Sequence, residues 1–151
     1  MRHIAKLFIF TLLTSYCYSM DFDPETFQID KGKIESGSSS AEIGKFAKEE
    51  AERADLILNE IYNEILLQYE ENPNFISQLR IAQRNWILYR DSHLHSIFPF
   101  ENSDSDPRNY VGNGYGFERN IELTEITWIR VKILYKWIDG NGKLNSHREG
   151  K

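Results

Sequence analysis

The chain has little cysteine, little proline and no long hydrophobic run. Its 151 residues include one cysteine, Cys17, so no disulfide can form within the chain and a disulfide-stapled scaffold is excluded. None of the four prolines lies between residues 25 and 72, which leaves room for a long helix. The apolar run at residues 7–16 is too short to span a bilayer. We therefore predict no membrane span.

The first residues are typical of a secretory signal. Arg2 and Lys6 precede the apolar run, and small residues at Cys17 and Ser19 suit cleavage after Ser19. We predict a signal peptide at 1–19 and a periplasmic or secreted protein. Acylation at Cys17, as in a lipoprotein, is the less favoured alternative because bulky Tyr16 precedes it.

Basic residues are also scarce, with 18 Lys and Arg against 23 Asp and Glu. Strong acidity argues against nucleic acid as a partner. It is compatible with a basic protein partner, and it also serves solubility. The sequence gives no oligomeric state.

Helical periodicity begins after a polar stretch. Residues 20–40 contain a Gly-Ser run and are expected to form a flexible N-terminal segment. A first helix is predicted from residue 41 to about 70, with apolar residues recurring every three or four positions. This stripe consists of Ala47, Ala51, Ala54, Leu58, Ile61, Ile65 and Tyr69.

Two further helices are predicted. Asn72 suits an N-cap and Pro73 the first position of a second helix, which carries Leu79, Ala82, Trp86 and Tyr89 on one face and ends near residue 96. A loop over 97–116 precedes a third helix, whose core face is predicted to be Ile126, Ile129, Ile133 and Trp137. The expected fold is all-α: a long antiparallel helical hairpin with a third packed helix. The helical domain covers 41–138, and 139–151 form a C-terminal tail.

Polar residues on the first two helices form a possible seam. Three pairs have the same sum of residue numbers, as an antiparallel hairpin requires: Asp55 with Arg90, Asn59 with Trp86, and Tyr62 with Gln83. A structural role in fixing the hairpin register is favoured. A functional patch is the alternative.

Catalytic and metal-binding patterns are weak. His93 and His95 are two apart, which puts them on different helix faces and makes them a poor metal pair. They are interpreted as solvated residues at a helix end. Runs such as Glu49-Glu50 are interpreted as a solvated helix face. No nucleophile or phosphate-loop motif occurs. We predict a non-enzyme with no catalytic residue, metal or cofactor.

Three motifs resemble one family. The pattern A-D-x-x-L-N-x-x-Y is followed by L-R-x-A-Q-R-x-W-x-x-Y-R-D and by T-x-x-R-x-x-x-L. These are similar to the LprI-like lysozyme inhibitor family of exported bacterial proteins. The residues that carry the resemblance are Ala54, Asp55, Leu58, Asn59, Tyr62, Leu79, Arg80, Ala82, Gln83, Arg84, Trp86, Tyr89, Arg90, Asp91, Thr127, Arg130 and Leu134.

The resemblance implies an exported helical protein that blocks a lysozyme or another peptidoglycan hydrolase. The chain departs from the family pattern, because members usually carry cysteines at positions corresponding to about Leu94 and about Glu122. Cysteines that precede the first motif in the family are also absent. We expect the loop residues Arg108, Tyr110 and Tyr115 to contact the partner, because arginine and aromatic residues are common anchors at interfaces. The alternative for this loop is an ordinary connection whose aromatic residues pack on the bundle. The alternatives are an immunity-type protein against another cell-wall toxin and a structural envelope module.

Overall fold

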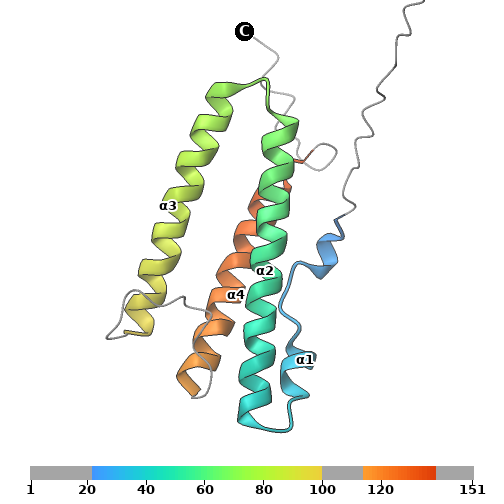
Figure 1. Ribbon diagram of the computed structural model, residues 1–151, viewed down its shortest axis with the longest axis vertical. Helices are drawn as coiled ribbons and strands as arrows, with labels where there is room; N and C mark the ends of the chain where they lie inside the picture. Colours follow the sequence, from blue (N-terminus) through green and yellow to red (C-terminus); the bar gives the residue numbers. More distant parts are fainter. Residues whose placement is uncertain (1–21, 100–113, 139–151) are drawn as a thin grey trace, which may run out of the picture.

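The computed structural model describes residues 22–99 and 114–138. In this part of the chain the secondary structure is helical, and three long helices run up, down and up: α2 (Ser40–Gln68), α3 (Pro73–Ile97) and α4 (Gly114–Tyr135) (Figure 1). A short 3-10 helix η1 (Pro24–Thr26) and a short helix α1 (Lys31–Glu35) precede them. The all-α fold is confirmed. The predicted signal peptide, Cys17 and the C-terminal tail lie outside the described residues.

Helix α2 is the central element. Ser39 caps it, because its Oγ accepts a hydrogen bond from the backbone N–H of Glu42 at 3.3 Å. The predicted apolar stripe from Ala47 to Ile65 is buried, and Tyr69 at its end is partly buried. Burial of this one face against neighbouring elements stabilises a helix whose other faces are charged.

Helix α3 begins where the sequence predicted. The Asn72 side chain accepts from the backbone N–H of Phe75 at 3.0 Å, and Pro73 occupies the first helical position. Much of its predicted apolar face is open to solvent, since Ala82 and Tyr89 are exposed. Of the predicted face, Leu79 is buried, and Leu94 near the end of the helix is buried as well.

The principal interface joins α2 to α4, with α4 running parallel to α2 (Figure 1). Helix α3 is antiparallel to both and diverges from α2 beyond the turn (Figure 1). The main core cluster includes Leu58, Ile61 and Ile65 of α2 together with Val131 and Leu134 of α4. Helix α4, the predicted third helix, thus makes with α2 the packing contacts that were expected between the two helices of the hairpin.

The predicted core face of α4 is only partly correct. Trp137, just after the helix, packs against the main core cluster, and Ile126 is partly buried. Ile129 is 59% exposed and Ile133 44% exposed. The buried face carries Thr124 and Thr127, whose hydroxyls donate to carbonyl oxygens four residues earlier at 2.6 and 2.7 Å. Because these hydroxyls are satisfied within the helix, threonine can face a core despite its polarity.

The N-terminal segment also differs from expectation. Residues 22–38 were expected to be flexible, but Phe22, Phe27 and Ile34 are buried. The Phe27 ring stacks on Trp128 with a centroid distance of 5.9 Å. The Tyr135 hydroxyl donates to the Phe22 carbonyl oxygen at 3.3 Å. Three large apolar residues in an otherwise polar segment are enough to hold it against the bundle.

Candidate functional site

Several motif residues gather around Trp86, where α2, α3 and α4 approach one another. The Arg90 guanidinium carbon lies 5.2 Å from the Trp86 ring centroid, and that of Arg130 lies 5.9 Å away. Both are cation–π distances, so one partly buried indole contacts two guanidinium groups from different helices. We refer to Asp55, Gln83, Trp86, Arg90 and Arg130 as the Trp86 cluster.

Arg90 lies between two carboxylates. Its Nη1 is 3.8 Å from Asp55 Oδ1 on α2, and its Nε donates to Asp91 Oδ1 at 2.8 Å. The contact predicted between Asp55 and Arg90 is therefore present but long, and the neighbouring Asp91 forms the shorter bond. This arrangement joins α3 to α2 at the level of Trp86.

The other two predicted pairs have different partners. The Asn59 amide donates to the Asp55 carbonyl oxygen at 2.8 Å, within α2. Gln83 Oε1 accepts from Arg130 Nε at 3.0 Å, which links α3 to α4. Gln83 thus bonds α4 instead of α2, and no hydrogen bond joins it to Tyr62 among the described residues.

Arg130 carries a charge into partly apolar surroundings. Burial lowers the pKa of its guanidinium, and the nearby Tyr62 opposes this shift. The group stays protonated, since arginine is not deprotonated in proteins. Its Nη2 is buried and has no hydrogen-bond acceptor among the described residues.

The remaining predicted site residues fall into two groups. Leu58 lies in the core, and Thr127 is buried with its hydroxyl bonded within α4. Arg108 and Tyr110 lie outside the described residues. Tyr115 belongs to α4, but its side chain is not described.

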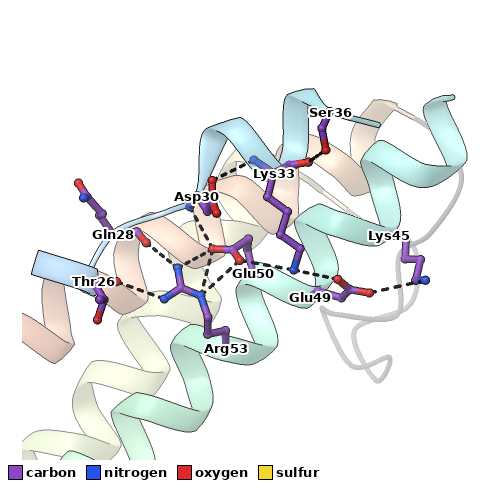
Figure 2. A network of polar contacts seen from close by, with 9 residues as sticks. All are labelled: Thr26, Gln28, Asp30, Lys33, Ser36, Lys45, Glu49, Glu50 and Arg53. Carbon is purple, nitrogen blue, oxygen red and sulfur yellow. Dashed lines mark hydrogen bonds and ion pairs between the residues drawn. The ribbon is translucent and has the colours of Figure 1, made fainter. Parts of the chain in front are cut away.

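A second polar cluster holds the N-terminal segment, and the sequence analysis missed it. The guanidinium of Arg53 donates to the carbonyl oxygens of Thr26 at 3.2 Å and Gln28 at 2.7 Å (Figure 2). Its Nη2 also lies 2.6 Å from Glu50 Oε2, which accepts in addition from the backbone N–H of Asp30 at 3.1 Å. We call these contacts the Glu50–Arg53 clasp.

Glu50 is only 2% exposed, so its interpretation as part of a solvated helix face is wrong. The face of Arg53 also covers Trp128 at 4.7 Å. The clasp therefore covers the Trp128 ring, which is buried and stacks on Phe27. The sequence signal for the burial of Glu50 was its position beside Ala51 of the apolar stripe. Many exposed glutamates also lie beside a buried residue of a helix, so this signal is not specific.

A third contact joins the far end of α3 to α4. His93 Nε2 is 3.0 Å from Glu122 Oε1, so His93 is not the solvated residue expected. Beside it, Leu94 packs in a small buried cluster with Ala51, Phe98 and Leu123. The two positions where the resemblance placed absent cysteines, about Leu94 and about Glu122, thus lie at one junction.

Residues 22–99 and 114–138 contain no group of three or more His, Cys, Asp or Glu placed to hold a metal ion. Within the same ranges, no helix combines the length and apolar character that crossing a membrane requires.

Comparison with known proteins identifies one family. The family whose model matches is described as lysozyme inhibitor LprI, and the match covers residues 33–134. This range includes α2, α3, nearly all of α4, and the whole Trp86 cluster. Neither a curated protein nor a solved structure matches the chain.

Proposed function

Because the chain belongs to the lysozyme inhibitor LprI family, we propose that it is an exported protein that binds and inhibits a lysozyme-like muramidase. The observation that carries this proposal is the family match over residues 33–134, about two thirds of the chain. In the described part the motif residues hold helices together rather than forming a catalytic group. A binding role fits this arrangement better than an enzymatic one.

Occlusion of the muramidase cleft is the proposed mechanism. Glycoside hydrolases of this kind place two carboxyl groups beside the scissile bond. An inhibitor needs to position one well-anchored side chain there, and arginine and aromatic residues are the common anchors at interfaces. We propose that Arg108, Tyr110 and Tyr115, which follow α3 and reach the start of α4, supply these anchors.

Net charge supports a basic partner. The chain carries a formal charge of −5, and removal of the proposed signal peptide with Arg2 and Lys6 makes it −7. Opposite charge on the two proteins accelerates their encounter, and salt weakens this steering.

A titration against a c-type lysozyme tests the proposal. The chain from Met20 onward is mixed with the enzyme at low and at physiological salt, and both binding and cell-wall lysis are followed. Salt-sensitive binding with loss of lysis would support inhibition. Absence of binding at both salt concentrations would reject lysozyme as the partner and direct the search to another cell-wall hydrolase, as for an immunity-type protein.

Arg108→Ala tests the proposed anchor. If Arg108 is a hot spot, the variant binds lysozyme more weakly by more than about 1 kcal/mol, a several-fold rise in Kd. The matched control is Arg84→Ala, which removes an exposed arginine from α3. Equal affinities for the Arg108 variant and the wild type would remove Arg108 from the interface.

A further inference from the structure

A pocket of about 290 Å³ opens between α3 and α4, next to the Trp86 cluster. Its lining consists of Phe75, Gln78, Leu79, Ala82, Arg130, Ile133, Leu134 and Trp137. Apart from Gln78 and Arg130, these side chains are apolar, and Arg130 is the one charged residue among them. Ligand sites commonly combine apolar walls with a small number of polar groups.

Arg130 differs from the other arginines that contact an aromatic ring in the described part of the chain. Arg90 has Asp55 and Asp91 beside it, and Arg53 has Glu50. Arg130 donates through its Nε to Gln83, whose amide oxygen carries no charge. Among residues 22–99 and 114–138, no carboxylate lies within ion-pair distance of Arg130, and its buried Nη2 lacks an acceptor.

A guanidinium that has no carboxylate partner and lies beside apolar side chains favours one kind of ligand. A carboxylate supplies both the opposite charge and hydrogen-bond acceptors, and its geometry matches the guanidinium fork. The apolar side chains opposite Arg130 would bury a hydrocarbon group.

We propose that this pocket binds a carboxylate carried on a small apolar group. The carboxylate accepts hydrogen bonds from Arg130, and the apolar group packs between Leu79, Ala82 and Trp137. A volume of about 290 Å³ lies at the small end of ligand pockets, which suits a group of side-chain size. Ile133, at 44% exposed, offers further apolar surface in the pocket lining. The proposal does not depend on lysozyme binding.

The test compares an acid with its neutral isostere. The ¹⁵N-labelled chain from Met20 onward is titrated with 4-methylpentanoate and with 4-methylpentanamide, and the Trp137 indole and Arg130 Nε–H signals are followed by NMR. The acid should shift both signals saturably, with a Kd on the order of millimolar for so few atoms. The amide should bind at least about tenfold more weakly. Equal binding by the two compounds, or no shift with either, would overturn the proposal.

Variants assign the effect to the pocket. Arg130→Met should abolish acid binding, whereas Lys132→Met, which removes an exposed charge from the same helix, should leave it unchanged. If Arg130→Met does not fold, Ala82→Leu narrows the pocket while keeping the guanidinium, and it should also abolish binding. Acid binding that survives Arg130→Met or Ala82→Leu, or that is lost in Lys132→Met as well, would place the site elsewhere and overturn the proposal.

The same titration separates two sources of the ligand. A short peptide ending in leucine presents the same isobutyl group and a carboxylate, but adds a polypeptide backbone. Tighter binding of the peptide would assign the site to the C-terminus of a protein chain. Equal or weaker binding would assign it to a free apolar acid. Failure of the peptide, the acid and the amide alike would overturn the proposal while leaving the lysozyme titration unaffected.

Discussion

At the scale of single residues, Glu50 is a carboxylate that α2 carries into the core. A buried charge is costly unless it is paired and hydrogen-bonded. Here one oxygen lies 2.6 Å from Arg53 Nη2 and accepts from the Asp30 N–H, and the other lies 3.7 Å from Lys33 Nζ. Both oxygens of Glu50 therefore have a cationic partner, which explains why this residue is tolerated inside.

Arg53→Met should lower the free energy of unfolding by about 1.5–3 kcal/mol, the range for a hydrogen bond to a charged group. The substitution removes the main cation beside Glu50 and two bonds to the N-terminal segment. Urea denaturation followed by tryptophan fluorescence measures the change. Glu52→Gln, at an exposed position of α2, is the control and should have little effect. A change in Arg53→Met as small as in the control would contradict the role of the clasp.

Sequence reasoning at this scale found Trp86 and Arg90, together with the contact between Arg90 and Asp55, but it gave the wrong partners for Asn59 and Gln83. The spacing of Gln83, Trp86 and Arg90 at i, i+3 and i+7 placed them on one side of a helix. Arg130 entered only through the family resemblance, so its hydrogen bond with Gln83 could not be predicted from spacing. Nor could spacing separate Glu50 from Glu49, since adjacent identical residues differ only in the direction they face.

At the scale of elements, α1 is fastened to α2 by an ion pair. Lys33 Nζ lies 2.9 Å from Glu49 Oε2. The hydrogen bond to Glu49 raises the pKa of Lys33, and the same bond lowers the pKa of Glu49. The lowered carboxyl pKa contributes stability above the ordinary glutamate value of about 4.3, and this is lost as pH falls through the folded value. The raised lysine pKa contributes below about 10.4 and is lost at higher pH.

Glu49→Gln should therefore reduce stability by a constant amount across neutral pH. The difference from wild type should shrink as pH falls below the ordinary glutamate range, because the wild-type carboxylate is then protonated too. Thermal unfolding of both proteins between pH 3 and pH 8 measures this. A difference that persists unchanged at pH 3 would show that the ion pair is not its source.

The link between α2 and α3 is predicted to be weak. Asp55 and Arg90 are 3.8 Å apart, both are partly exposed, and Asp91 competes for the same guanidinium. A double-mutant cycle with Asp55→Ala and Arg90→Ala should give a coupling of about 0.2–1 kcal/mol. Full additivity would mean that the pair contributes nothing. A coupling of several kcal/mol would mean that the contact is closer in solution.

The three long helices were predictable to within a few residues, whereas η1 and α1 lie in the segment that was predicted to be flexible. The buried faces of the long helices were predicted less evenly. The stripe on α2 was read correctly because it contains only apolar residues at regular spacing. On α4 the larger aliphatic residues Ile129 and Ile133 were assigned to the core, while Thr124 and Thr127 occupy it. Hydrophobicity scales rank isoleucine above threonine. They take no account of a threonine hydroxyl that is already hydrogen-bonded within its own helix.

At the scale of the whole molecule, the N-terminal segment is part of the core. Phe27 is buried against Trp128 and Tyr135, although the polar residues around it led to a prediction of flexibility. Phe27→Ala should therefore lower the free energy of unfolding by about 3 kcal/mol, as expected for a buried aromatic residue. Chemical denaturation gives the value, with exposed Glu25→Ala as the control. A change in the free energy of unfolding near zero would mean that the N-terminal segment is flexible, as the sequence predicted.

The junction between α3 and α4 is held without a covalent bond. His93 and Glu122 form a polar contact there, and Leu94 packs with Leu123 in a buried cluster. The positions where family members usually carry cysteines correspond to about these residues. In this chain, packing and a polar contact join the two helices at the place where the resemblance would put a bridge.

The parallel pairing of α2 with α4 also determines when the core can close. The apolar face of α2 is complete once Gln68 has been made, but its main partner begins at Gly114, after all of α3. Contacts so distant in sequence require a large loop to close before they stabilise the fold. During synthesis, the α2 stripe is thus exposed while α3 emerges. A nascent chain that stops before α4 should consequently associate with other apolar surfaces, including those of chaperones.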